Sequence, residues 1–236
     1  TALYRVGIAA CDRVFFQNPD DVAQFMESGI LRDHSKIVRV NGSGVDTQHF
    51  SQRPLPEGAP TFLFVGRLLK EKGITEYVEA AKLVRSAHPA TRFIAVGPHD
   101  PNLPHSVSTT QLDTWRSEGV VDFIGGVKDV RPWLEDCSVL VLPSYREGTP
   151  RAVLEAMSVG RPVITSDAPG CRETVTDEVN GLLLPPRESR PLASAMERFI
   201  SDPALAPTMA AESRKLAEDK YDVRKVNQAI LQGMRL

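Results

Sequence analysis

Apolar residues occur along most of the chain in short, almost continuous runs. Such runs, rich in Val, Ile, Leu and Phe, are typical of strands buried on both faces of a parallel sheet. Between them apolar side chains recur at helical spacing, as over 74–84 and again over 192–199. Strands alternating with helices predict an α/β fold with a doubly wound, Rossmann-like parallel sheet. Six strands are predicted, at residues 61–65, 93–96, 120–124, 138–142, 162–165 and 181–184.

The first 50 residues do not fit this sheet. After a helical piece they contain a strand at 13–18, a helix that starts near Pro19 and a strand at 36–41, which make about two α/β units. Because so small a piece buries too little apolar surface to fold alone, residues 1–50 are expected to be the remnant of another domain. The remaining segments are a Pro-rich linker at 51–60, the main domain at 61–220 and an amphipathic terminal helix at 221–236.

The segment EGTPRAVLE, residues 147–155, places two carboxylates eight positions apart around a predicted helix start. Thr149 is expected as the N-cap and Pro150 as the first helical residue, so free N–H groups there form a site for a diphosphate. Glu147 precedes the helix and Glu155 lies within it, no more than about 12 Å of helical rise away. One carboxylate can then bind a sugar and the other a ribose. The alternative is an ordinary helix start followed by an exposed Glu.

Two cations follow the first strand of the main domain. Arg67 lies just beyond the strand, and Lys72 opens the next helix beside Gly73, where the backbone can approach a ligand closely. A guanidinium and an ammonium there can hold both phosphates of a diphosphate. Because ligands of such sheets collect beyond the carboxyl ends of the strands, Val127 and Glu147, which follow other strands, are candidates for the same site. Two solvated surface cations are the alternative.

Composition narrows the classes of partner. With 28 basic and 30 acidic side chains the net charge is −2, which provides no general field for nucleic acid. The sequence shows neither a run of 18 apolar residues nor a secretion signal, which predicts a cytoplasmic protein. Cys11, Cys137 and Cys171 lack metal-ligand spacing and are expected to be small buried residues.

No metal and no cofactor are expected. The five histidines show no metal-binding pair, and the DxD motif of metal-dependent transferases does not occur. The sequence also lacks G-x-G-x-x-G, which argues against a nicotinamide dehydrogenase. Glu147 and Glu155 do not read as the acid and nucleophile of a hydrolase, because nothing places either of them in an apolar pocket. Arg67 and Lys72 would replace a metal cation electrostatically.

Several motifs together resemble a known family. They are FVGRLLKEKG at 64–73, VGP at 96–98, GGVKDV at 125–130, the long segment VLPSYREGTPRAVLEAMSVGRPVITSDAPGCRE at 141–173, and NGLLLPP at 180–186. In this order they resemble the donor-binding half of the family-four retaining glycosyltransferases with the GT-B fold. The resemblance covers roughly residues 36–236. GSGVDTQHF at 42–50 and HDPNLP at 99–104 are most similar to bacterial capsular-polysaccharide and polyprenyl-linked glycan hexosaminyltransferases.

The resemblance implies roles for individual residues. Arg67 and Lys72 match the cations that stabilise the departing diphosphate. Glu155 matches the carboxylate that binds the ribose, and Glu147 the one that binds a hydroxyl of the transferred sugar. Arg67, Lys72 and Glu147 are thus the expected catalytic residues. The full set of expected donor-binding residues is Gly66, Arg67, Lys72, Val127, Asp129, Ser144, Glu147, Gly148, Thr149, Pro150, Arg151 and Glu155.

Some of these assignments have alternatives. The backbone of Val127 matches a contact to the nucleobase, and Asp129 either lies near the base or caps the short helix that follows. The main chain of residues 148–149 would donate to the sugar or the distal phosphate. Ser144 either adds a hydroxyl near the phosphates or caps locally, and Arg151 reaches the phosphates or merely solvent.

The function implied is transfer, with retention, of a hexose or N-acetylhexosamine from an NDP-sugar, with UDP as the expected nucleotide. The acceptor would be a saccharide or a polyprenyl-linked glycan, held by an N-terminal domain of which residues 1–50 are a part, at the inner face of the cytoplasmic membrane. Peripheral membrane association is therefore expected. A chain that starts within that domain is expected to bind donor without transferring sugar. Two alternatives are a non-catalytic nucleotide-sugar-binding or interaction module and a GT-B sugar-nucleotide epimerase.

Overall fold

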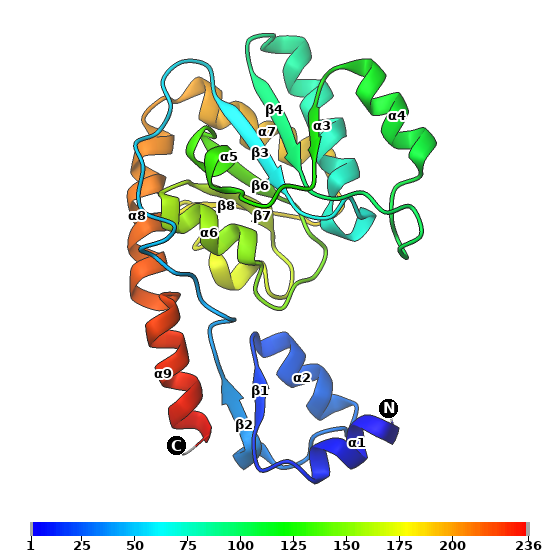
Figure 1. Cartoon of the computed structure of the whole chain (residues 1–236), viewed down its shortest axis with the longest axis vertical. Coiled ribbons are helices and arrows are strands. Elements are labelled where there is room, and N and C mark those ends of the chain that lie inside the picture. Colours follow the sequence, from blue (N-terminus) through cyan, green and yellow to red (C-terminus); the bar gives the residue numbers. More distant parts are fainter. Residues whose placement is uncertain (1, 235–236) are drawn as a thin grey trace.

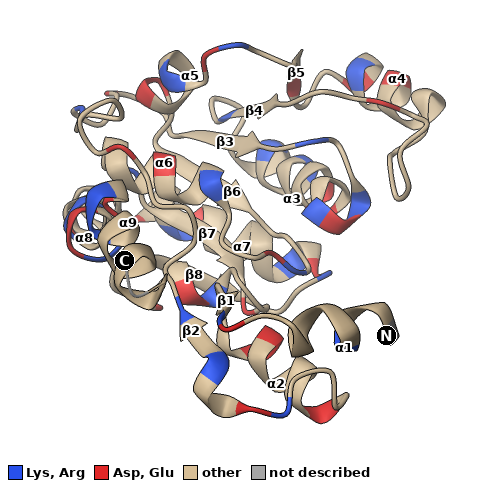
Figure 2. Ribbon diagram, turned by 60° about the horizontal axis from the view of Figure 1, so that its bottom comes forward, with Lys and Arg blue, Asp and Glu red and all other residues tan. Residues whose placement is uncertain are grey.

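The computed structural model describes residues 2–234, which form a large lobe of residues 61–220 and a small lobe of residues 2–39 (Figure 1). Thr1, Arg235 and Leu236 lie outside the described residues, so the last two positions of the predicted terminal helix do as well. Basic and acidic residues are interspersed over the ribbon of both lobes (Figure 2). No helix in the described part of the chain is long and apolar enough to cross a membrane.

The large lobe is built on the predicted six-stranded parallel sheet. Its strands are β3 (Thr61–Val65), β4 (Arg92–Val96), β5 (Asp122–Gly125), β6 (Val139–Leu142), β7 (Val163–Ser166) and β8 (Gly181–Leu184), in the order β5-β4-β3-β6-β7-β8. The residues of β6 and β7 are all buried, as the continuous apolar runs predict. The α/β prediction with a doubly wound parallel sheet is therefore confirmed.

Helices cover both faces of this sheet. On one face α3 (Ile74–Ala87) packs against α7 (Ser189–Ser201), and on the other α6 (Arg151–Val159) packs against α5 (Arg131–Glu135) and α8 (Leu205–Lys220). Connections also contain α4 (Thr109–Glu118) and the 3-10 turns η2 (Lys70–Lys72) and η3 (Arg172–Thr174). The buried Tyr77 hydroxyl donates to the Phe62 carbonyl at 2.8 Å and accepts from the Ile94 N–H at 3.1 Å. These bonds tie α3 to β3 and β4.

The strand order reverses between β3 and β6. From β3 the chain adds β4 and β5 on one side, then returns to the other side of β3 to add β6, β7 and β8. Right-handed crossovers in opposite directions leave a crevice at the carboxyl ends of the two central strands, where ligands of doubly wound sheets bind. The loops after β3 and β6, which carry most of the predicted site residues, meet at this point.

The small lobe contains the elements predicted for the first 50 residues. They are α1 (Ala2–Ala9), β1 (Val14–Phe16), α2 (Pro19–Glu27), the 3-10 turn η1 (His34–Lys36) and β2 (Ile37–Arg39), with β1 and β2 paired in parallel. The side chain of Asn18 caps α2 by accepting from the Asp21 N–H at 2.8 Å, and Pro19 occupies the first helical position. Two short strands make a much smaller sheet than that of the large lobe.

Two segments run between the lobes, residues 40–60 and the chain after α8, and they lie side by side. Val45 forms a parallel bridge with Asp222, and its N–H donates to the Tyr221 carbonyl at 2.8 Å. Residues 51–60 contain neither helix nor strand. The final helix α9 (Val223–Met234) runs beside the small lobe (Figure 1), where Gly233 lies so close to Val38 that a Cβ at position 233 would be 2.8 Å from its Cγ1.

The expectation for the cysteines was correct at two positions and wrong at one. Cys137 and Cys171 are buried in the large lobe, whereas Cys11 is exposed. Cys11 follows the end of α1, and its sulfhydryl donates to the Gly7 carbonyl of that helix. Apolar packing on the small lobe is too sparse to cover this side chain, because most residues of α1 are exposed.

Candidate functional site

The loops after β3 and β6 bring the predicted Lys72 and Glu147 together. Their side chains form an ion pair with 2.5 Å between Lys72 Nζ and Glu147 Oε1, and both side chains are largely shielded from solvent. The N–H of Glu147 donates to the Pro169 carbonyl at 2.9 Å, so the loop after β7 also supports it. A shielded ion pair at the switch point of the sheet is the centre of the candidate site.

Two glycines allow these loops to pack backbone against backbone. Gly73 has a φ of +75°, and a Cβ there would lie 2.2 Å from the Pro143 carbonyl oxygen. Gly170 has a φ of +81°, and a Cβ there would lie 2.1 Å from the carbonyl oxygen of Glu147. A side chain at either position would push the loops apart. The ion pair therefore depends on glycine on both sides of it.

The start of α6 differs by one residue from the prediction. Pro150 is the N-cap rather than the first helical residue, because its ψ of 111° is extended and its carbonyl accepts from the Val153 N–H at 3.1 Å. The N-cap prediction for Thr149 is therefore wrong. Its side chain lies instead against Gly42, where a Cβ would come within 2.6 Å of Thr149 Cβ.

The helix start nevertheless offers free hydrogen-bond donors. No side chain caps α6. Within residues 2–234 the N–H groups of Gly148, Thr149 and Arg151 have no protein acceptor. Together with the partial positive charge of the helix N-terminus, these donors suit an anion such as a phosphate.

Glu155 lines a cavity of about 660 Å³ on one side of this helix start. Its side chain is 14% exposed. Burial raises the pKa of its carboxyl group above the usual value of 4.5, while the Arg151 guanidinium, 3.4 Å away, lowers it. The other predicted site residues that line this cavity are Val127, Asp129 and Arg151, together with residues 43–46, 49 and 50 of the segment between the lobes.

Asp129 is engaged locally. Its Oδ1 accepts from the Arg131 N–H at 3.0 Å, and its carboxylate also binds the Arg131 guanidinium. These bonds hold the pKa of Asp129 down at about 2. Asp129 lies one residue before Val130, the N-cap of α5, and its carboxylate thus stabilises the start of this helix. This agrees with the capping alternative. Asp129 also borders the cavity that Glu155 lines.

Glu147 lines a different cavity, of about 790 Å³, on the other side of the α6 start. Gly148 borders it as well, and so do the residues Asp21, Lys70, Glu71, His105, Tyr145, Arg146 and Arg187. The Tyr145 hydroxyl donates to Glu76 at 2.6 Å, and the Arg187 guanidinium lies 4.7 Å from the centre of the Tyr145 ring. The two predicted carboxylates thus line two different cavities, with Gly148 at one and Arg151 at the other.

Three other predicted residues of the loops after β3 and β6 differ in exposure and in hydrogen bonding. Arg67 is exposed, its side chain has no ion-pair partner within residues 2–234, and it lines neither cavity. The buried Ser144 donates its hydroxyl to the Glu71 carbonyl at 3.1 Å, so this group ties the two loops together. The Gly66 N–H donates to the Val96 carbonyl at 2.9 Å and extends the β3–β4 pairing.

The sequence patterns did not predict that the small lobe contributes residues to the candidate site. Asn18 is completely buried, and its amide approaches the carbonyl oxygens of Glu147 and Gly148 at 3.4 Å. Arg146 binds Asp21 and Gln24 of α2. The signal in the sequence was the cap Asn18 followed by an acidic first turn, which predicts a helix start but not what that start touches.

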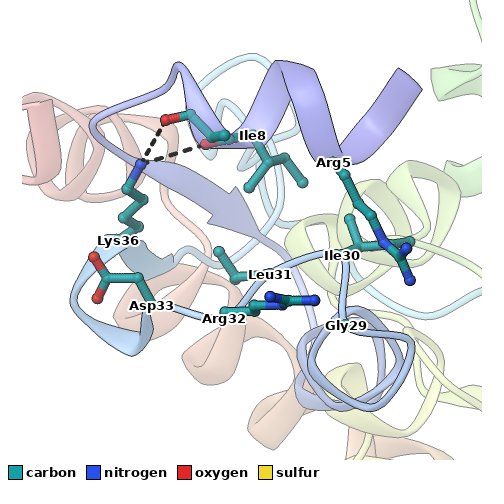
Figure 3. A pocket seen from close by; sticks show the side chains of 9 residues that line it. Arg5, Ile8, Gly29, Ile30, Leu31, Arg32, Asp33 and Lys36 are labelled. Carbon is teal, nitrogen blue, oxygen red and sulfur yellow. Dashed lines mark hydrogen bonds between the residues drawn. The ribbon is translucent and has the colours of Figure 1, made fainter. Parts of the chain in front are cut away.

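The small lobe has a cavity of its own, of about 360 Å³, between α1 and the loop after α2 (Figure 3). Lys36 Nζ donates there to the carbonyls of Ile8 and Ala9, at 3.4 and 3.0 Å. This lysine therefore satisfies the free carbonyls at the end of α1. None of the predicted site residues lines this cavity. Among the described residues no cluster of His, Cys, Asp or Glu could hold a metal ion.

Comparison with known sequences connects this geometry to one family. The sequence profile described as "Glycosyl transferases group 1" matches residues 59–202, more than half of the chain. The chain is 27% identical over 245 residues to N,N'-diacetylbacillosaminyl-diphospho-undecaprenol alpha-1,3-N-acetylgalactosaminyltransferase of Campylobacter jejuni, covering 98% of this chain and 62% of that protein. It is 30% identical over 196 residues to the putative colanic acid biosynthesis glycosyltransferase WcaL of Escherichia coli, covering 77% of this chain and 47% of WcaL. The chain thus spans about half to three-fifths of the length of these relatives.

Solved structures share the fold. Sucrose-phosphate synthase from Thermosynechococcus elongatus superposes with a TM-score of 0.84 at 25% identity, covering 99% of this chain and 60% of that one. HepE of Anabaena, solved in complex with UDP-glucose, superposes with a TM-score of 0.82 at 23% identity, covering 95% of this chain and 64% of that one. The superpositions extend over both lobes, because they cover nearly the whole chain.

Proposed function

The chain belongs to the group 1 glycosyl transferases and has the GT-B fold, and from this premise we propose that it binds the nucleotide-sugar donor of a sugar transfer. The proposed donor is a UDP-linked hexose or N-acetylhexosamine, and the acceptor a saccharide or polyprenyl-linked glycan in cell-surface polysaccharide or glycan synthesis. The names of the Campylobacter and Escherichia relatives support this acceptor class, and the HepE complex supports UDP.

The observation that carries the proposal is the arrangement of two carboxylates around one helix N-terminus. Glu155 lines the hollow on the side of Val127, and Glu147 lines the hollow on the other side. Gly148 borders one hollow and Arg151 the other, so the free N–H groups of the α6 start lie between them, and the ammonium of Lys72 binds Glu147. A UDP-sugar has the same sequence of groups, namely ribose hydroxyls, two phosphates and sugar hydroxyls, so it would lie across the start of α6.

In the proposed sugar transfer the departing diphosphate itself assists the reaction. The bond between the anomeric carbon and the β-phosphate oxygen breaks while the acceptor oxygen bonds to the same face of that carbon. The acceptor proton passes to the departing phosphate, so retention requires no protein nucleophile. Lys72 and Arg67 would stabilise the negative charge that develops on the diphosphate, a contribution of about 3 to 4 kcal/mol per donor in comparable sites. No metal ion is needed in this scheme.

A calorimetric screen of the chain with UDP, GDP, ADP and their common sugar conjugates tests the proposal. We expect UDP to bind more tightly than GDP or ADP, and one UDP-sugar to bind more tightly than UDP. A complete lack of binding by every nucleotide would refute the proposal. Assays with lipid-linked acceptors at a membrane surface then test the acceptor class and the proposed location at the inner membrane face.

A further inference from the structure

The first turn of α2 touches the loop that carries Glu147. The amide of the completely buried Asn18 donates to Asp21 Oδ2 at 2.9 Å and lies 3.4 Å from the carbonyl oxygens of Glu147 and Gly148. Gln17 packs against the same loop so closely that a Cβ on Gly148 would lie 2.5 Å from Gln17 Oε1. The small lobe therefore contacts the main chain at the Glu147 carbonyl and at Gly148.

Ion pairs surround this contact. Arg146, the residue before Glu147, binds Asp21 and also Gln24, with 2.7 Å to Gln24 Oε1. Arg172 binds Asp20 at 3.1 Å and Asp167 at 2.6 Å. These contacts join two acidic residues of the small lobe to two arginines of the large lobe. They form only when the lobes lie as they do in this structure.

We propose that residues 17–21, which comprise the start of α2 and the two residues before it, are a latch that positions the loop of residues 146–148 for the donor sugar, with Asn18 and Asp21 as positioning residues. The identity of the ligand rests on the proposed function. The latch fixes the carbonyls of Glu147 and Gly148, and the β7 loop fixes the Glu147 N–H. Contact with the small lobe thus acts together with the Lys72 ion pair and the Pro169 hydrogen bond to set the position of the carboxylate that would bind the sugar. Sugar binding and lobe contact must then strengthen each other by the same factor.

Binding of UDP and UDP-glucose to variants tests the positioning role. Asn18→Ser keeps the helix cap but removes the amide donor, and Asp21→Asn removes the charge opposite Arg146. Glu27→Gln is the matched control, because it removes one negative charge from the same helix away from the contact. We expect both test variants to bind UDP within about twofold of the parent and UDP-glucose roughly 5- to 20-fold more weakly, near the lower end of usual coupling strengths. The control should match the parent for both ligands.

A distance measurement tests the latch without any donor. One nitroxide label on the exposed Cys11 and one on Ser117→Cys report on the two lobes by double electron–electron resonance, and Cys137 and Cys171 are buried. We expect Asn18→Ser and Asp21→Asn to broaden the distance distribution and Glu27→Gln to leave it unchanged, at equal melting temperatures.

Unchanged distances in both test variants would overturn the latch. Broadened distances with equal losses of UDP and UDP-glucose affinity would overturn the positioning role. If the parent chain binds no nucleotide at all, the proposed donor function fails instead. The distances alone then decide whether the first turn of α2 holds the lobes together.

Discussion

At the scale of single residues, Lys72 and Arg67 have different surroundings although the sequence suggests one shared role. Lys72 is shielded and paired with Glu147, whereas Arg67 is exposed, with no ion-pair partner in the described part of the chain. Arg67 is thus free to turn toward a diphosphate. Lys72 would have to share its charge between Glu147 and a phosphate.

Replacing either cation by Ala should weaken binding of UDP by about 1.5 to 3 kcal/mol, the range for hydrogen bonds to charged groups. Binding of uridine should stay nearly the same, because the nucleoside has no phosphate. Calorimetry with uridine and UDP measures this contrast. The control is Arg92→Ala, because Arg92 is an exposed arginine at the first residue of β4, at the end of the strand away from the site. Equal losses for uridine and UDP would mean that these cations act on folding and not on phosphate.

The two carboxylates should act on opposite ends of the donor, because they line different cavities. Glu155→Ala should weaken binding of every ribonucleotide, including the monophosphate. Glu147→Ala should lower only the affinity for UDP-sugar, and the freed Lys72 should preserve the affinity for UDP. Titrations of both variants with UMP, UDP and UDP-sugar test this division. The assignment would be wrong if Glu147→Ala lost UDP affinity as severely as Glu155→Ala.

At the scale of elements, glycines determine how closely the loops at the site approach. Gly73 ends the turn after β3 and precedes α3, and Gly119 ends α4. Both have left-handed backbone, with φ of +75° and +65°. They differ in surroundings, since a Cβ on Gly73 would collide with Pro143, whereas a Cβ on Gly119 would meet nothing within 4 Å.

Gly119→Ala should therefore cost about 1 to 2 kcal/mol of unfolding free energy, the penalty of a left-handed alanine. Gly73→Ala should lower the unfolding free energy by at least about 1 kcal/mol more than Gly119→Ala. The reason is that the overlap of the new Cβ with Pro143 adds to the penalty of the left-handed backbone. Gly73→Ala should also weaken UDP-sugar binding by displacing Lys72 from Glu147. Urea unfolding of both variants measures the difference. Equal costs would show that the loops can separate without strain.

At the scale of the whole molecule, the two segments between the lobes are joined by a buried carboxylate. The Thr47 hydroxyl donates to Asp222 Oδ2 at 2.7 Å, and Arg224 binds the same carboxylate through its guanidinium and its N–H. The Arg224 guanidinium, with a smaller contribution from Thr47, holds the pKa of Asp222 well below its ordinary value of 3.8. This group therefore stabilises the fold in its charged form.

Asp222→Asn should lower the unfolding free energy at pH 7 by about 1 to 3 kcal/mol, the range for a lost charged hydrogen bond. Because the folded pKa lies below the unfolded one, the stabilisation is complete above pH 3.8 and is lost as pH falls through the folded value. The difference between the variant and the parent should thus shrink below that pH. Urea unfolding at pH 7 and pH 3 measures it. A difference that does not depend on pH would rule out the charge as its source.

The local sequence determined the elements of the fold. Strands β3 and β8 begin and end at the predicted residues, because both show as continuous apolar runs, although β8 at the sheet edge is fully buried only over its first two residues. Lys72, Glu147 and Glu155 were predicted as site residues from their spacing around strand ends and one helix start together with the family resemblance. That helix start was misplaced by one residue, because Thr149 packs against Gly42, more than 100 positions away in the chain.

Tertiary structure alone decided how these elements meet. The strand order, with its reversal between β3 and β6, is not written in any local pattern, because the sequence of a strand does not show which strand it pairs with. Lys72 and Glu147 pair across 75 positions, and Asn18 reaches the Glu147 carbonyl across 129. Hydrophobic periodicity shows which side of an element is buried but not which distant residue covers it. The two cavities and the contact between the lobes therefore became visible only in the folded chain.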